Sequence, residues 1–353
     1  MESRKKIIFS YQGAFGPPTL GHYQSMVLFT EMMIDHIGAE NYTVYMMFMP
    51  TASSGSKKHL QPTQKLRIKT LEIFCEKLRE EFSDFPNFFF VASMLEYELY
   101  PITKSTGTIH TIKEIIGETT LTEKPDYLKS FSRDNDELIL GMGADNMYQL
   151  PYWADVEKYK DMVNKIFIVQ RPPSDEDRVN LGQFNLNEKT FLLQKTIPWN
   201  FKLSKLKSIL ESEIEILKEH IIIDDSEDIK IKKGFDLSTV IDGIIKLKIE
   251  LPDILVSEII PMPTSSSMMR YFLSIYVDKY FDIIKNLMFG SREIDDIEID
   301  IILETVAFYK EFFESNPKPE NKNYDSTYED MFPQIGKKDP MKGGKKYFIE
   351  YSI

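Results

Sequence analysis

The stretch Gly13-Ala14-Phe15-Gly16-Pro17-Pro18-Thr19-Leu20-Gly21-His22 decides the fold of this chain. It follows an apolar run over 7–9, which predicts a buried strand. It precedes apolar residues spaced three, four and four between Met26 and Ile37, which predict one face of a helix. Glycines allow close approach to the backbone, the first N–H groups of a helix attract anions, and an imidazole can donate to a phosphate oxygen. This turn is therefore a predicted polyphosphate site, with a histidine at the start of its helix.

The composition is that of an ordinary soluble globular protein. The chain has 353 residues, 42% hydrophobic and 28% charged, which allows one or two domains. We expect an intracellular protein, cytoplasmic or nuclear, because no apolar run is long enough for a signal peptide or a membrane span. The net charge of −12 argues against broad nucleic-acid binding. The oligomeric state stays open, and a homo-oligomer is compatible with this composition.

Cysteine and histidine usage limits the metal chemistry. A single cysteine, Cys75, excludes internal disulfides and cysteine-based metal centres, and its helical apolar surroundings predict a buried thiol. Five scattered histidines show no ligand spacing, so we expect no metal centre built by the protein.

Strand-like and helix-like segments alternate through the first half of the chain. This alternation predicts an α/β fold with a Rossmann-like, doubly wound parallel sheet, whose ligands lie beyond the carboxyl ends of the strands. The predicted strands are 6–10, 42–49, 88–93, 137–141 and 165–170, and the predicted helices are 23–37, 62–82, 108–117 and 145–160.

The second half of the chain divides into segments of different composition. We expect 1–173 to form the core, 174–255 to be an insertion of unknown role, 256–315 to complete the core with helices, and 316–353 to be a polar tail. Within the insertion, apolar residues between Leu203 and Leu217 repeat at helical spacing and predict an amphipathic helix.

A second candidate anion site lies at Pro263-Thr264-Ser265-Ser266-Ser267-Met268-Met269-Arg270. Hydroxyl residues precede a helical apolar pattern, so Ser266 or Ser267 is expected to cap a helix. A helix start with hydroxyls and an arginine one turn later also suits phosphate. Both interpretations stay open on the residues alone.

Two further segments carry candidate site residues. A predicted strand leads into Gly143, Ala144 and Asp145, and Trp153 follows after a short gap. On the residues alone, a core position is a serious explanation for Trp153. Thr108 opens a predicted helix upstream.

These segments resemble a known family. The first stretch resembles the G-x-F-x-P-x-[HT]-x-G-H signature of the nucleotidylyltransferase superfamily, with Thr19 in the place of the first histidine and Gly16 where an acidic or amide residue is usual. The serine-rich stretch resembles its I-S-S-T-x-x-R motif, with Ser267 in the place of threonine. The segments at Thr108, at Gly143–Trp153 and at the strand before Arg171 are similar to those of nicotinamide and nicotinate mononucleotide adenylyltransferases.

The resemblance implies transfer of AMP from ATP to nicotinamide mononucleotide (NMN) or nicotinate mononucleotide (NaMN), with Mg²⁺ bridging the phosphates. It implies catalytic roles for His22, Arg270 and Lys57. It places the mononucleotide at Thr108, Asp145 and Trp153. The remaining implied nucleotide contacts are Gly13, Ala14, Phe15, Thr19, Gly21, Gly143, Arg171, Ser266 and Ser267, although the Phe15 side chain itself suggests packing.

Two alternatives remain on the sequence. One is another adenylyltransferase of the superfamily, acting on phosphopantetheine or flavin mononucleotide. The other is a nucleotide-binding or scaffold protein without turnover, which Gly16, Gly107 and the long insertion keep open.

Overall fold

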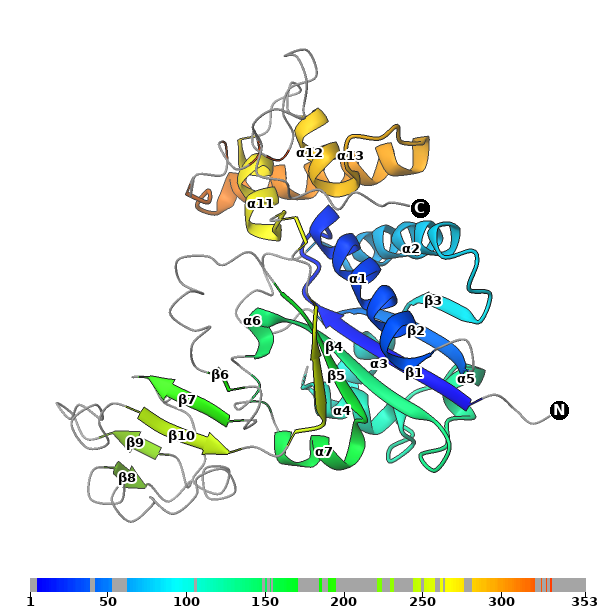
Figure 1. Cartoon of the computed structure of the whole chain (residues 1–353). Helices are drawn as coiled ribbons and strands as arrows, with labels where there is room; N and C mark the ends of the chain where they lie inside the picture. The colour runs from blue at the N-terminus through cyan, green and yellow to red at the C-terminus, as the bar shows by residue number, and fades with distance from the viewer. Residues whose placement is uncertain are drawn as a thin grey trace, which may run out of the picture.

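The computed structural model describes residues 5–38, 42–52, 62–104, 107–147, 150, 153, 155–170, 251–257, 261–262, 264–275, 281–320, 325, 328 and 331, with five short strands between 184 and 248. A central parallel sheet carries helices on both faces (Figure 1).

The central sheet has six strands in the order β11-β5-β4-β1-β2-β3, and every pair is parallel. This arrangement confirms the predicted Rossmann-like, doubly wound α/β class. The strand order reverses beside β1, which is where ligands bind in such sheets. The strands are β1 (Lys5–Gly13), β2 (Tyr42–Pro50), β3 (Phe88–Ala92), β4 (Glu137–Gly143), β5 (Lys165–Val169) and β11 (Asp253–Val256).

Alternating strand residues supply two separate cores. Ile7 and Phe9 of β1 face one core together with α1 (Leu20–Ile37) and α2 (Gln64–Glu81). Ile8 faces the other core, beneath α3 (Leu95–Thr103) and α4 (Thr108–Ile115). The strands are buried on both faces, which explains why they read as continuous apolar runs.

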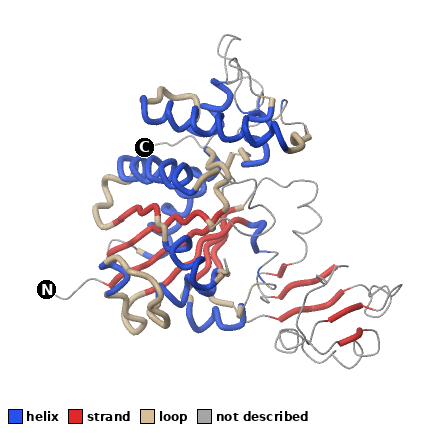
Figure 2. The backbone as a smooth tube through the Cα atoms, turned by 180° about the vertical axis from the view of Figure 1, so that it is seen from behind, coloured by secondary structure: helices blue, strands red, loops and turns tan. Residues whose placement is uncertain are grey.

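The C-terminal helices extend the first core. These are α11 (Ser266–Ser274), α12 (Phe281–Phe289) and α13 (Asp296–Ser315), and they lie beside α1 and α2 (Figures 1 and 2). Asp295 and Glu298 form a capping box at the start of α13. Tyr328 and Met331, within the range expected to be a polar tail, pack on this same core.

Two predictions differ from the structure. Residues 253–256 pair with β5 as the sixth strand, so the expected insertion 174–255 takes in part of the central sheet. Where the structure describes 145–160, the expected continuous helix is replaced by short pieces, namely α6 (Ala144–Met147), the 3-10 turn Val156–Lys158 and α7 (Tyr159–Met162).

Short strands form two small sheets away from the central one (Figure 1). One has the order β10-β7-β6 and the other pairs β8 with β9. The amphipathic helix predicted over 203–217 lies outside the described residues. These strands are β6 (Phe184–Asn185), β7 (Thr190–Gln194), β8 (Ile221–Ile223), β9 (Ile229–Ile231) and β10 (Ile244–Lys248).

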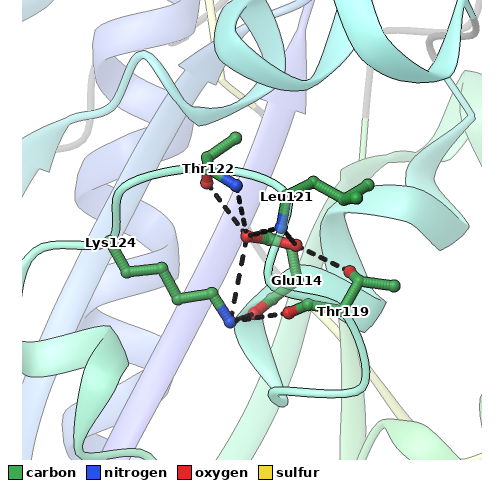
Figure 3. A network of polar contacts seen from close by, with 5 residues as sticks. All are labelled: Glu114, Thr119, Leu121, Thr122 and Lys124. Atoms are coloured by element: carbon green, nitrogen blue, oxygen red, sulfur yellow. Dashed lines mark hydrogen bonds and ion pairs between the residues drawn. The ribbon is translucent and has the colours of Figure 1, made fainter.

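A buried carboxylate organises the loop between α4 and α5 (Asp126–Lys129). Glu114 accepts hydrogen bonds from the Thr119 hydroxyl (2.6 Å), the Leu121 amide (3.0 Å) and both the amide and hydroxyl of Thr122 (3.0 Å each) (Figure 3). The Lys124 ammonium lies 3.9 Å from the carboxylate and donates to the Glu114 and Thr119 carbonyls. Burial alone would raise the pKa of Glu114, but these hydrogen bonds outweigh it and lower the pKa.

Candidate functional site

The loop after β1 turns around a buried aromatic ring. Phe15 has a φ of 41°, in the left-handed region that side-chain-bearing residues rarely occupy, and the Gly16–Pro17 bond is cis. The Phe15 ring is fully buried, with its centroid 5.0 Å from that of the His22 imidazole. A Cβ added to Gly13 would come within 3.0 Å of the same ring. Phe15 is therefore a packing residue.

His22 closes the start of α1. Thr19 is the N-cap residue, and its backbone N–H donates to Nδ1 of His22 (3.0 Å). The Thr19 hydroxyl lies 2.8 Å from the same nitrogen. Because Nδ1 accepts from a backbone amide, we assign the proton of the neutral ring to Nε2. The tautomer with an Nε2–H donor is the one that the expected phosphate role of His22 requires.

The second and third amides of α1 have protein partners. The Gly21 amide donates to the Thr264 hydroxyl (2.5 Å), and the His22 amide donates to the Thr19 carbonyl (2.9 Å). A Cβ on Gly21 would meet the Thr264 carbonyl oxygen at 2.6 Å. Gly21 is therefore required by close packing against Thr264, and the amides of Gly21 and His22 are engaged within the protein.

The serine-rich stretch lies against the same loop. Ser265 is the N-cap of α11 and accepts from the Met268 amide (3.1 Å), so the expectation that Ser266 or Ser267 caps the helix was wrong. The Ser266 hydroxyl donates to the Pro17 carbonyl (2.9 Å) and is not free for a ligand. The amides of Ser266 and Ser267 open α11, and helix-opening amides have no partner within their own helix.

Arg270 connects α11 to the loop. Its Nη1 donates to the Gly16 carbonyl (2.5 Å), and its Nη2 donates to the Ser267 hydroxyl (3.0 Å). A guanidinium carries five N–H donors, so these contacts leave capacity for a phosphate. Arg270 therefore stands at the loop with its charge available for an anion.

A second arginine supports the loop from the interior. Arg67 of α2 is fully buried and donates from Nη1 to the carbonyls of Ala14 (2.7 Å) and Thr51 (2.9 Å). Its charge acts on Glu96 of α3, which is 2% exposed and accepts from the Ala52 amide (3.1 Å). Burial lowers the pKa of Arg67 to about 10 and raises that of Glu96 to about 8. At neutral pH the arginine is charged and the carboxyl is protonated.

The acceptor side of the predicted site is only partly assembled by contacts. Thr108, at the start of α4, donates from its hydroxyl to Oε1 of Gln12 (2.7 Å), one residue before Gly13. Thr108 therefore lies at the same sheet edge as the loop. Nε2 of Gln12 is buried and has no hydrogen-bond partner among the described residues.

Trp153 lies on the second core. It is half-buried and its ring is edge-on to Tyr159, with centroids 6.4 Å apart. Gly143 ends β4 beside Val169, and Asp145 follows within α6, with a side chain outside the described part. Lys57 and Arg171 also lie outside the described residues.

Sequence reasoning missed several residues that hold this site together. Arg67, Glu96 and Tyr309 were not among the predicted site residues. A signal existed for Arg67, because it lies in helical register with Leu71, Phe74 and Leu78 on the buried face of α2. A charged residue on an apolar face needs buried partners.

The donor set suits phosphate and not a metal ion. The groups at the loop are N–H and O–H donors, which match phosphate oxygens, whereas Mg²⁺ requires oxygen ligands. Within the described ranges, no group of three or more His, Cys, Asp or Glu side chains could hold a metal. In the same ranges, no helix combines the length and apolarity that crossing a bilayer requires.

Comparisons with known proteins give no family. No family model and no curated protein matches the chain. Plasmodium falciparum nicotinic acid mononucleotide adenylyltransferase is similar in its complexes with NaAD (TM-score 0.40, 16% identity) and with APC (0.39, 15%), each covering 86% of this chain and 97% of the other. A putative nicotinate-nucleotide adenylyltransferase from Vibrio parahaemolyticus is similar over 50% of this chain and 80% of its own (TM-score 0.28, 18% identity). At these values the likeness does not decide the function, which must be argued from the residues of the site.

Proposed function

We propose that this chain is a nucleotidyltransferase that transfers AMP from ATP to NMN or NaMN and releases pyrophosphate. One observation carries the proposal. His22 and Arg270 are far apart in the sequence, but both lie at the loop after β1. Each is oriented by a hydrogen bond, His22 by the Thr19 amide and Arg270 by the Gly16 carbonyl. A donor-rich loop of this kind at the switch point of a doubly wound sheet suits a polyphosphate.

The reaction needs no nucleophile from the protein. An oxygen of the mononucleotide phosphate attacks the α-phosphorus of ATP, and the bond to the β-phosphate breaks as pyrophosphate leaves. The site contributes orientation and stabilisation of the charge that develops on the phosphate oxygens. We assign the Nε2–H of His22 to the α- and β-phosphates. Arg270 and the first amides of α11 are assigned to the β- and γ-phosphates and the departing pyrophosphate.

Mg²⁺ fits this site as part of the nucleotide. The described loop groups are donors without carboxylates, so Mg²⁺ would enter bound to the triphosphate, where it neutralises phosphate charge. Lys57 would add a further positive charge to the triphosphate, and Arg171 a further nucleotide contact.

The acceptor is supported by sequence patterns and one contact. The Thr108 hydroxyl donates to Gln12 near the end of β1. This contact lies on the sheet face against which Trp153 packs. Thr108, Asp145 and Trp153 would form the mononucleotide side. Stacking of a cationic pyridine ring on the Trp153 indole would favour binding of a pyridine nucleotide over other phosphate acceptors.

The test is pyrophosphate release from ATP and Mg²⁺ with NMN, NaMN, phosphopantetheine or flavin mononucleotide, assayed in parallel. We expect turnover with a pyridine nucleotide. Turnover only with one of the other acceptors would keep the phosphate assignments and overturn the acceptor assignment. No turnover with any of them, in folded protein that binds ATP, would leave the nucleotide-binding alternative.

A further inference from the structure

Tyr309 of α13 is buried beside Arg270 of α11. Its side chain is fully buried, and its hydroxyl accepts a hydrogen bond from the Arg270 guanidinium. Two helices that are distant in sequence, α11 and α13, are therefore joined at one phenol oxygen.

Two arginines hold the loop after β1. Arg67 donates to the Ala14 carbonyl and Arg270 donates to the Gly16 carbonyl. Phe15, between them, has the left-handed backbone conformation. The loop is therefore fixed on either side of its most constrained residue by two guanidinium groups, one of which, that of Arg270, also donates to Tyr309.

The chemistry of the phenol suits this position. A guanidinium can only donate, so the phenol oxygen is a matching acceptor for Arg270. Burial raises the pKa of Tyr309, and although Arg270 and Arg67 oppose this effect, the hydroxyl stays neutral. A neutral acceptor orients Arg270 without cancelling the positive charge that an anion would meet.

We propose that Tyr309 is a positioning residue for the anion site, whose hydroxyl orients Arg270 and, through its bond to the Gly16 carbonyl, the loop over Gly13–Pro18. The kinetic part of this inference rests on the proposed adenylyl transfer. The effect on the loop does not, because it concerns the protein without substrate.

The competing explanation is a purely packing role for Tyr309. Its ring contacts Phe308 and Phe313, with centroids 4.9 and 5.9 Å away. Tyr309→Phe keeps this ring and removes only the hydroxyl. Tyr271→Phe is the matched control, because it removes a hydroxyl from α11 that donates to exposed Asp325 (3.2 Å).

The primary measurement is amide hydrogen exchange of peptides covering 13–19 in the full chain without nucleotide. We expect exchange about 10-fold faster in Tyr309→Phe than in the wild type, the size expected for losing a hydrogen bond to a charged group. Tyr271→Phe should match the wild type. Unchanged exchange in Tyr309→Phe would overturn the proposal.

Kinetics separates positioning from general destabilisation. In Tyr309→Phe we expect kcat/KM for ATP to fall about 10-fold, while KM for the mononucleotide stays constant. If the KM values for ATP and for the mononucleotide change equally and the Tm is lowered, Tyr309 has a packing role and the proposal is overturned. If Tyr309→Phe does not fold, Arg270→Lys replaces it: it keeps the charge but cannot reach Gly16 and Tyr309 together, so it should loosen the same peptides.

Failure of the proposed function is distinguishable from failure of this inference. A wild type that releases no pyrophosphate with any acceptor refutes the adenylyl transfer. The exchange of 13–19 then decides alone whether Tyr309 positions the loop.

Discussion

Nδ1 of His22 lies 3.0 Å from the backbone nitrogen of Thr19 and accepts its hydrogen bond. In most capping boxes a glutamate or glutamine at this third helical position receives that bond. Here the capping acceptor and the candidate catalytic donor belong to one ring, so the bond that starts α1 also selects the tautomer that can donate to phosphate.

The two roles of His22 can be separated by substitution. His22→Asn places an amide oxygen where Nδ1 lies but has no donor at the position of Nε2. We expect it to keep wild-type stability and to lower kcat by roughly 10²–10³, the usual effect of losing a preorganised donor. His22→Ala should lose as much turnover and also about 1 kcal/mol of the free energy of unfolding. Near-wild-type turnover in His22→Asn would refute the assignment of Nε2–H.

The tautomer itself is measurable. Nitrogen-15 NMR of the imidazole should show a protonated Nε2 and an unprotonated Nδ1 in the neutral ring. The opposite pattern would contradict the capping geometry.

Gly21→Ala should destabilise the chain although alanine is the better helix former. Propensity favours alanine by about 1 kcal/mol, but the new Cβ would lie 2.6 Å from the Thr264 carbonyl oxygen. We expect a net loss of about 1–3 kcal/mol in urea unfolding, typical of overpacking. Ser25→Ala is the control, because the Ser25 hydroxyl bonds only to the Gly21 carbonyl of its own helix (2.8 Å). A gain in stability for Gly21→Ala would mean that α1 and the Thr264 segment are not in contact.

Glu96 should make the protein less stable as the pH rises. Burial raises its pKa from 4.5 to about 8, so between these values the folded chain keeps a proton that the unfolded chain has released. The free energy of unfolding should therefore fall through this window by about 1 kcal/mol per pH unit.

Glu96→Gln removes this dependence while keeping an acceptor for the Ala52 amide. The variant should gain stability over the wild type steadily from pH 5 to pH 8 and no further above it, as followed by urea unfolding at each pH. Glu98→Gln, an exposed position on the same helix, is the control and should track the wild type. Parallel curves for wild type and Glu96→Gln would show that Glu96 ionises normally.

The sequence predicted local structure well and non-local pairing poorly. Five strands were found because parallel strands buried on both faces read as apolar runs. β11 was missed because a four-residue strand is defined by its pairing with β5, which no local pattern reveals. The continuous helix expected near 145–160 ignored Pro151, which disfavours helix at the residue before it.

The site divides in the same way. The loop and the serine-rich stretch were visible as motifs because glycine, proline and hydroxyl residues have local meanings. The role of Arg67 was not visible, since its partners Ala14, Thr51 and Glu96 come from three other segments. Motifs predicted a phosphate site at the loop, but not the residues that hold the loop in place.

Trp153 distinguishes a ligand-stacking role from a core role. Its ring contacts Tyr159 and is half-buried, so Trp153→Ala removes both core contacts and any stacking surface. If the indole stacks on the pyridine ring, KM for the mononucleotide should rise about 10-fold while KM for ATP stays constant. Trp153→Phe, which keeps an aromatic face, should recover most of this loss. Equal changes in both KM values with a lowered Tm would assign Trp153 to the core, and the acceptor would then have to be recognised through Thr108 and Gln12, where a buried amide nitrogen lacks a partner among the described residues.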